Sequence, residues 1–435
     1  MPQSDADRRV AIWQNQFVVT NQSYANLERK FLINLFLGSG YGLAGTINTD
    51  KLSIADLRKL MGMPLDGQYS ETQLAFSSLL ASGASDVTKQ IALIGASRVE
   101  GWPVSNFANT IGQLLAAKLA TKYNMRAPSR GFIGVPSAVM AAVGSWPTVL
   151  NAPIASDDFT FNLGHKHRIA YTNGAGSLTH TFDPANKPVS TVVKHIGTTS
   201  GAANCLRATP DGAAAQLFST VGPARSSDIG SFIGDMTAKT NVIIDNGNPG
   251  VGYMLYSGID EINTAEGTFG TGIKVHNFGN SGYSAQNWLS NPGAGQLSSL
   301  ELVSDFVCDL YVYSDFPIND MGTTQLRSTA QAVADLQAVI DKIRGLAGGN
   351  HLVLLPEDCS HAVTLTDTWA NIRAAFKAQF DTDAAKTNKI YFVDMGKYVP
   401  NSRQNPSLFQ ADGIHTASNG AFNEVFASAL ASKIL

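Results

Sequence analysis

The 435-residue sequence predicts an α/β domain that is interrupted by an antiparallel β region. Residues 91–95, IALIG, form an apolar run that ends in glycine and precedes a helical repeat over 107–123. This order of strand, turn and helix opens an α/β unit. Short alternating runs separated by Gly, Asn, Asp and Pro fill about 130–265, which is typical of an antiparallel β-sandwich. Buried-strand and long-helix patterns return after 266, so the α/β domain is completed there.

These patterns divide the chain into four parts. Apolar residues at helical spacing predict an N-terminal helical segment over 1–85, either an attachment or oligomerisation element or a cover on the core. The α/β domain takes 86–129 and 266–435, and the inserted β-sandwich takes 130–265. Six strands are predicted in the insertion, over 168–172, 177–182, 190–196, 215–221, 240–245 and 251–256. The last part contains predicted strands at 272–278, 308–314, 351–356 and 389–395 and predicted helices at 325–346 and 417–435.

Composition excludes several classes of function. The chain carries 31 basic and 34 acidic residues and no basic stripe, so no nucleic-acid partner is expected. The longest apolar stretch near the start, 31–37, is far shorter than the roughly 20 residues of a membrane span, so no membrane partner is expected. The polar start, MPQSDADRR, lacks the apolar region of a cleaved signal peptide. Only 15% of the residues are charged, which is typical of an extracellular or virion-associated protein.

Ser97 is the first candidate for catalytic chemistry. It follows the strand 91–95 in the turn Gly95-Ala96-Ser97, at the carboxyl edge of the sheet, where open α/β folds bind ligands. Its backbone N–H lies near a helix start, which favours a developing anion. The pattern over 95–101 is G-x-S-x-x-x-G and not the G-x-S-x-G nucleophile elbow, and a helix cap is the alternative role for this serine.

Three further motifs could carry chemistry. Asp412 precedes His415 by three residues, a spacing at which a carboxylate reaches the imidazole and orients it as in a serine triad, with a capped helix as the alternative. The loop 277–284, NFGNSGYS, contains two glycines whose backbone N–H groups can turn toward a ligand, with an ordinary turn as the alternative. Asn319, in PINDMG, can donate its amide to an oxyanion, with an ordinary Asx turn as the alternative.

Together and in this order, the four motifs resemble those of the SGNH hydrolases, the GDSL-like esterase family. The resemblance covers 86–128 and 266–435, and it implies a three-layer, flavodoxin-like α/β fold. The positions that match the family's catalytic and oxyanion-hole residues are Ser97, Gly282 (with Asn277), Asn319 (with Asp320), Asp412 and His415.

The chain departs from the family pattern in two places and carries a long surplus. Ala96 replaces the usual aspartate, and Pro317-Ile318 replaces the usual small residues, but neither change removes a reacting group. Ser97 and Gly282 are 185 residues apart, whereas compact family members separate these blocks by a few tens of residues. The surplus marks 130–265 as an insertion, and its deletion is expected to leave a folded α/β domain. The chain also resembles family members with a β-sandwich insert, several of them bacteriophage tail-appendage esterases.

The resemblance implies acyl transfer at an ester. His415 would take the proton of Ser97, whose oxygen attacks the carbonyl carbon, and Asp412 would hold the imidazole tautomer. The N–H groups of Ser97 and Gly282 and the Asn319 amide would hold the oxyanion. This chemistry needs no metal or cofactor, and none is expected. His165 and His167 are interpreted as exposed polar residues of the β region rather than as a metal pair.

Aromatic residues near the motifs indicate a carbohydrate substrate. Trp102, Tyr283, Trp288 and Phe316 flank the serine and the oxyanion loops, where such rings can stack on sugars, although core packing is the alternative. The expected partner is an acetylated polysaccharide or oligosaccharide from which O-acetyl groups are removed. A general small-ester esterase or lipase is the second hypothesis. The third is a non-catalytic glycan-binding virion protein, and virion attachment or homo-oligomerisation would use the N-terminal segment.

Overall fold

The computed structural model describes residues 89–434 with internal gaps. The gaps are 102–103, 105–106, 123–130, 135–147, 150–169, 173–176, 185–186, 198–201, 222–225, 249–253, 263–272, 291–297, 304–305, 307, 315, 323–324, 348–351, 357, 359 and 361–362. The predicted N-terminal helical segment, 1–85, therefore lies outside the described residues, as do Trp102, His165 and His167.

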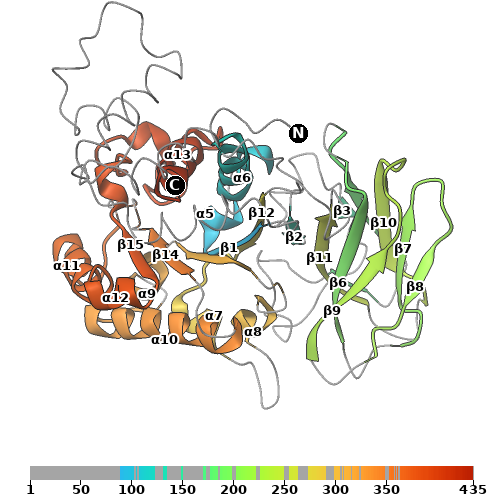
Figure 1. The fold of residues 1–435 in the computed structure, drawn as a ribbon, viewed down its shortest axis with the longest axis horizontal. Coiled ribbons are helices and arrows are strands. Elements are labelled where there is room, and N and C mark those ends of the chain that lie inside the picture. Colours follow the sequence, from blue (N-terminus) through green and yellow to red (C-terminus); the bar gives the residue numbers. More distant parts are fainter. Residues whose placement is uncertain are drawn as a thin grey trace, which may run out of the picture. The chain divides into compact units, whose positions relative to one another are not determined.

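A five-stranded parallel sheet lies at the centre of the α/β part, with the strand order β12-β1-β13-β14-β15 (Figure 1). Its strands are β1 (Lys89–Gly95), β12 (Ile273–Gly279), β13 (Leu310–Tyr313), β14 (Leu352–Pro356) and β15 (Ile390–Val393). Numbered within this sheet, the order is 2-1-3-4-5, which is the flavodoxin-like order. The predicted α/β sheet is confirmed, since each of these strands overlaps a predicted one.

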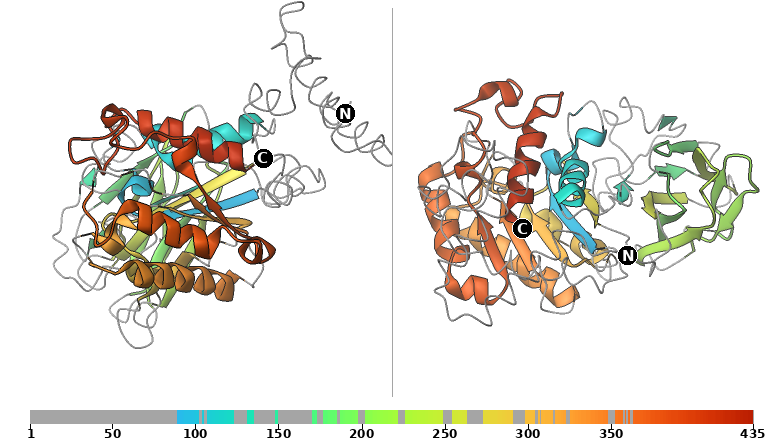
Figure 2. Two further views of the ribbon diagram at one scale, coloured as in Figure 1. Left: turned by 90° about the vertical axis from the view of Figure 1, so that its left-hand side faces the viewer. Right: turned by 45° about the horizontal axis from the view of Figure 1, so that its top comes forward.

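Helices lie on both faces of the parallel sheet and make three layers (Figure 2). Ile91 and Leu93 of β1 pack in one hydrophobic cluster with α6 (Ile111–Lys122) and α13 (Ala421–Lys433). Ala92 and Ile94 pack in a second cluster on the opposite face. The helices of that face are α7 (Ala285–Leu289), α8 (Ser299–Val303), α10 (Thr329–Ala347) and α11 (Trp369–Phe380). Successive strand side chains point to opposite faces, which explains why a strand covered on both sides is apolar throughout.

The remaining α-helices of the described chain are short. They are α5 (Ser97–Glu100), α9 (Ile318–Met321) and α12 (Asp383–Thr387). The helices predicted over 325–346 and 417–435 are present as α10 and α13. The predicted elements do not include α11, although Thr368 caps its start and its buried residues recur at every fourth position. No described helix is long and apolar enough to cross a membrane.

Residues 132–262 contain two antiparallel sheets, drawn largely in green in Figure 1. One has the order β3-β5-β10-β7-β8, and the other has the order β2-β11-β6-β9 with β4 paired to β11. Their strands are β2 (Phe132–Gly134), β3 (Thr148–Val149), β4 (Ala170–Thr172), β5 (Ser177–Thr181), β6 (Ser190–Gly197), β7 (Leu206–Pro210), β8 (Gln216–Phe218), β9 (Ser226–Ile233), β10 (Asn241–Asn246) and β11 (Met254–Ile262). Side chains of both sheets, such as Val242 and Ile259, share one hydrophobic cluster.

Each of the six strands predicted in this region overlaps an observed strand, but the prediction misses β2, β3, β7 and β9 and shortens β11. The β9 sequence, SSDIGSFI, is rich in residues that mark turns, and its pairing with β6 overrides that local preference. A turn is predicted at Gly258, where β11 instead continues. The register of β11 against β6 shifts between Tyr256 and Gly258, so the glycine marks a β-bulge rather than the end of a strand.

The antiparallel sheet that contains β2 and β11 contacts the parallel sheet at its β12 edge. The backbone N–H of Phe132 in β2 donates to Nδ1 of His276 at 3.1 Å, and its ring stacks on Phe278 with 5.7 Å between centroids. Lys274 of β12 forms a buried ion pair with Asp260 of β11, with 2.6 Å between Nζ and Oδ1. The β12 edge is therefore packed against strands of the antiparallel region.

Candidate active site

Three predicted site residues lie just after strands of the parallel sheet, at its carboxyl edge. Ser97 follows β1, Gly282 follows β12 and Asn319 follows β13. These are the three neighbouring strands at which the strand order reverses. Open α/β sheets bind ligands at such a switch point because the loops on its two sides lead to opposite faces. The topology thus brings the three residues to the edge of the sheet at which open α/β folds bind ligands.

Ser97 begins α5 after a tight turn and is 8% exposed. A Cβ on Gly95 would lie only 2.5 Å from a methyl group of Val99, so the turn accepts glycine alone at this position. Ala96 occupies the N-cap position, and its methyl group offers no side-chain cap to the helix. Gly101 has a φ of 96° and closes the helix, with its N–H donating to the carbonyl oxygen of Ser97 at 3.1 Å.

The loop after β12 is held against the serine turn by backbone contacts. The N–H of Asn280 donates to the carbonyl oxygen of Gly95 at 2.9 Å. The N–H of Ser281 donates to Oε2 of the buried Glu100 at 2.6 Å. A Cβ on Gly279 would lie 1.9 Å from the backbone nitrogen of Glu100, so the two loops can approach this closely only at a glycine.

The oxyanion-hole residues predicted in the other two loops are also tied together. Asn319 donates from Nδ2 to the carbonyl oxygen of Tyr283 at 2.9 Å, and the N–H of Ala285 donates to Oδ1 of Asp320 at 2.7 Å. Gly282 has a φ of 82°, and no atom lies within 4 Å of the position that its Cβ would take. The space on the Cβ side of Gly282 is therefore open.

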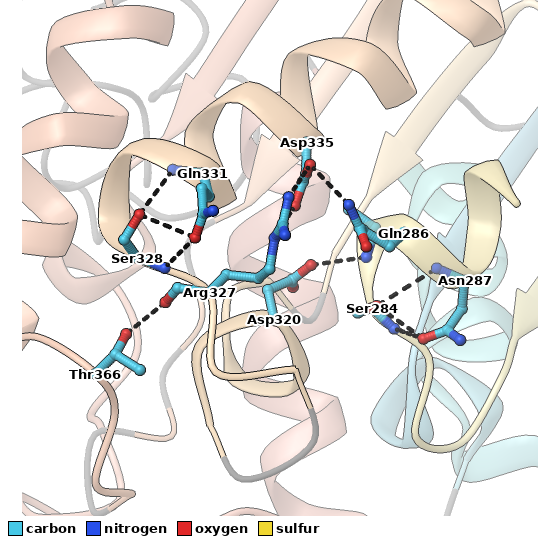
Figure 3. Close-up of polar contacts among 10 residues, drawn as sticks. Ser284, Gln286, Asn287, Asp320, Arg327, Ser328, Gln331, Asp335 and Thr366 are labelled. Atoms are coloured by element: carbon cyan, nitrogen blue, oxygen red, sulfur yellow. Dashed lines mark hydrogen bonds and ion pairs between the residues drawn. The ribbon is translucent and has the colours of Figure 1, made fainter.

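Asp320, whose carboxylate accepts the N–H of Ala285, is buried beside the start of α7 (Figure 3). Arg327 pairs with Asp335 through two hydrogen bonds of 2.7 and 3.0 Å, and Gln286 of α7 also donates to Asp335 at 3.3 Å. Burial raises the pKa of Asp320 to about 6, and the negative Asp335 adds to this, against the opposing effects of the Ala285 N–H and Arg327.

Asp320→Asn is expected to stabilise the fold relative to the wild type as pH rises. The pKa of Asp320 is higher in the folded than in the unfolded protein, so the folded state binds the extra proton between about pH 4 and 6 and loses stability as pH rises through that window. Between pH 4 and 8 the difference in unfolding free energy between variant and wild type should change by about 3 kcal/mol in favour of the variant. Urea unfolding at both pH values measures it. A difference in unfolding free energy that is the same at both pH values would contradict the raised pKa of Asp320.

Asp412 and His415 form the carboxylate–imidazole pair that their spacing predicts. Oδ2 of Asp412 lies 2.6 Å from Nδ1 of His415, while Oδ1 accepts the N–H groups of Ile414 at 2.9 Å and His415 at 3.0 Å. Burial by itself raises the pKa of Asp412, but the hydrogen bonds from His415 and the Ile414 amide outweigh it and hold the pKa below its usual value. The ionised carboxylate keeps the proton on Nδ1 and leaves Nε2 as the acceptor.

The start of α13 connects the His415 loop to the segment that follows the serine turn. Asn423 donates from Nδ2 to the carbonyl oxygen of Asn109 at 2.9 Å, and Asn109 donates from Nδ2 to the carbonyl oxygen of Asn419 at 3.3 Å. Asn109 lies just before α6, which is the first long helix after Ser97. The loop that carries the histidine is therefore anchored to the same end of the sheet as the serine turn.

Two of the four aromatic residues predicted to contact substrate are core residues. Trp288 is 0% exposed and Phe316 is 4% exposed, and both belong to the cluster on one face of the sheet. Rings that are buried in this way pack inside the protein and cannot stack on a sugar, so the structure corrects the expectation for them. Tyr283 is partly buried and packs edge-on against Trp288, with 5.2 Å between centroids. Trp102 is not among the described residues.

Three buried charged residues at this edge are missing from the sequence prediction. They are Arg98, Glu100 and Asp358. Glu100 holds the loop after β12, and Arg98 forms an ion pair with Asp358 after β14. The sequence did place a charged residue just after an apolar strand. A charged side chain that is buried in such a position needs a partner, so this pattern could have indicated an ion pair. Within the described part of the chain, no group of three or more His, Cys, Asp or Glu side chains is placed to hold a metal ion.

Comparison with known proteins gives a likeness in structure and none in sequence. No family model matches the sequence, and no curated protein matches it. A solved structure of a peptidoglycan O-acetylesterase in action is similar to this chain with a TM-score of 0.56 at 15% identity, covering 84% of this chain and 95% of that one. This likeness shows a shared fold. A second structure, of a carbohydrate esterase with divergent catalytic and non-catalytic binding functions, has 10% identity and covers 60% of this chain and 94% of its own. Its TM-score of 0.23 is too low to support an argument.

Proposed function

We propose that this protein is an SGNH-type serine esterase that removes O-acetyl groups from a carbohydrate through an acyl-enzyme on Ser97. The observation that carries the proposal is the Asp412–His415 pair, which is anchored to the sheet edge where the Ser97 turn meets the loops of Gly282 and Asn319. The fold shared with a peptidoglycan O-acetylesterase supports an acetylated polysaccharide as the substrate class.

The proposed reaction has two acyl-transfer steps. Nε2 of His415 takes the proton of the Ser97 hydroxyl, and the serine oxygen attacks the acetyl carbonyl carbon. The bond from that carbon to the sugar oxygen then breaks, and His415 gives its proton to the departing oxygen, which leaves as a sugar hydroxyl. Water attacks the acetyl-serine with His415 again as the base, which releases acetate and restores Ser97.

The oxyanion of each tetrahedral intermediate would be held by the N–H groups of Ser97 and Gly282 and by the Asn319 amide. An amide –NH₂ group carries two donors. The hydrogen bond from Asn319 to the carbonyl oxygen of Tyr283 uses one of them and fixes the plane of the group. The second N–H can then serve the oxyanion without a change of rotamer.

The two antiparallel sheets supply the other part of the proposal. Because they share one hydrophobic cluster and lie between β1 and β12 in the chain, we infer that 130–265 is a β-sandwich inserted into the hydrolase domain. Contact with the carbohydrate polymer is its proposed role. An extracellular or virion-associated location, with attachment through residues 1–85, completes the proposal.

Acetate release tests this function directly. Wild-type protein and the Ser97→Ala variant should be incubated with O-acetylated peptidoglycan, with other acetylated polysaccharides and with a chromogenic acetate ester. Serine-dependent release from a polymer supports the proposal. Cleavage of the small ester alone would favour a general esterase or lipase, and no release from any substrate would favour a glycan-binding protein without catalysis.

The pH profile provides a separate prediction. Activity should fall on the acid side because a protonated His415 cannot accept the proton of Ser97. A chelator should leave the profile unchanged, and phenylmethylsulfonyl fluoride should inactivate the enzyme by modifying the serine. Initial rates from pH 4 to 9 with and without EDTA measure both effects. An enzyme that EDTA inactivates and zinc restores would be a metal-dependent deacetylase instead.

A further inference from the structure

A chain of buried polar contacts joins the residue after Ser97 to the residue before His415. Arg98 donates from Nη2 to Oδ2 of Asp358, and Oδ1 of Asp358 accepts the N–H of Ser360 at 2.6 Å. Ser360 in turn donates from Oγ to the carbonyl oxygen of Ile414 at 3.1 Å. The side chains of Arg98, Asp358 and Ser360 are all buried.

The sheet topology explains why the widest gap in this series is bridged by an arginine and an aspartate. Arg98 follows β1 and Asp358 follows β14, and β13 lies between these two strands. Neighbouring strands are about 4.8 Å apart, so the two loops are separated by about 10 Å. A long arginine and a short carboxylate can bridge such a gap across the end of the middle strand.

Arg98 also contacts the helix that follows His415. Its guanidinium carbon lies 5.6 Å from the centroid of the Phe422 ring in α13. Phe422 packs against Phe409, with 4.7 Å between centroids, and Phe409 pairs with Thr416 in an isolated β-bridge. The guanidinium therefore reaches both sides of the His415 loop, one through Asp358 and Ser360 and the other through the aromatic pair.

We propose that Arg98, Asp358 and Ser360 are positioning residues that fix Ser97 relative to His415. This inference rests on the proposed function. A buried ion pair contributes little net stability because desolvation offsets its attraction, whereas it restricts the geometry of the groups that it joins. Here it joins the helix that Ser97 begins to the loop of the base. Misplacement of reacting groups by about 1 Å can lower turnover by about 10²-fold.

The test removes the hydrogen bond from Ser360 to the carbonyl oxygen of Ile414 and compares that variant with a matched control. Ser360→Ala deletes one hydroxyl that donates to a backbone carbonyl. Ser432→Ala deletes the same kind of bond, from Oγ of Ser432 to the carbonyl oxygen of Ala429, at the far end of α13. We expect Ser360→Ala to lower kcat on a chromogenic acetate ester about tenfold with KM unchanged, and Ser432→Ala to alter neither. Adding Arg98→Lys to Ser360→Ala should lower kcat by less than the product of the two single effects, because both changes break one chain.

A measurement without turnover separates this inference from the proposed function. The His415 ring signals, observed by NMR with ¹³C-labelled histidine, should shift in Ser360→Ala and stay in place in Ser432→Ala. If wild-type protein hydrolyses no ester but these signals shift, the proposed function fails and the positioning link stands. Unchanged kcat with unchanged ring signals would overturn the link. Independent effects in the double variant, or a loss of kcat that only follows the unfolded fraction in a thermal melt, would overturn it as well.

Discussion

Replacing Ser97 by alanine is expected to abolish ester hydrolysis while the protein stays folded. His415→Ala should have the same effect, because the nucleophile and the base act as one unit and the loss of either removes the covalent route. Such losses reach about 10⁶ in turnover in serine hydrolases, and the double variant should be no worse than either single one. Ser97 is small and lies at the start of a four-residue helix without a side-chain cap, so its hydroxyl adds little to the fold.

Initial rates with a chromogenic acetate ester measure this loss, and thermal melts report whether each variant is folded. Ser428→Ala is the matched control, since its exposed hydroxyl donates only to the carbonyl oxygen of Glu424 within α13. It should retain the wild-type rate. Turnover above a few per cent in Ser97→Ala or His415→Ala would contradict the assignment of the nucleophile or the base.

The sequence was informative where the structure depends on local patterns. The strand over Ile91–Ile94 is apolar on both faces because helices cover both sides of it, and a continuous apolar run is typical of such a buried strand. Asp412 and His415 meet because they are three residues apart in one turn, so their contact needs no knowledge of the rest of the fold. The order of the strands has no local signal, and it was predicted only through the family resemblance.

The features that sequence analysis missed depend on contacts between distant parts of the chain. Arg98 and Asp358 are 260 residues apart, and only the strand order places one beside the other. Trp288 lies close to the oxyanion loop in sequence, which suggested substrate contact. It belongs instead to the inner side of α7, a helix of five residues that is too short to show an amphipathic repeat.

Deletion of 130–265 is expected to prevent the α/β domain from folding, contrary to the expectation from sequence that the insertion is separable. The motifs proposed to be catalytic do lie outside it, but its strands complete the core beside β12. Phe132 of β2 is buried against Phe278 and Phe306, with 5.7 and 5.3 Å between ring centroids. The backbone N–H of Phe132 also donates to Nδ1 of His276. Burial holds the pKa of His276 well below its usual value, so the ring is neutral and Nδ1 can accept this hydrogen bond. The deletion would expose these rings and leave that nitrogen without its donor.

Two single substitutions estimate how much the contacts between the β region and β12 stabilise the fold. Phe132→Ala should lower the free energy of unfolding by about 3–5 kcal/mol, the usual cost of removing a buried phenylalanine. Asp260→Ala should cost a similar amount, about 3–5 kcal/mol, because it leaves the buried Lys274 without its partner at 2.6 Å. Ile243→Ala on an exposed position of β10 is the control and should change stability by well under half as much. Urea unfolding of the three variants measures the differences. A deletion protein that unfolds cooperatively and still cleaves an acetate ester would show that the β region is an independent module, and near-wild-type stability of Phe132→Ala and Asp260→Ala would point the same way.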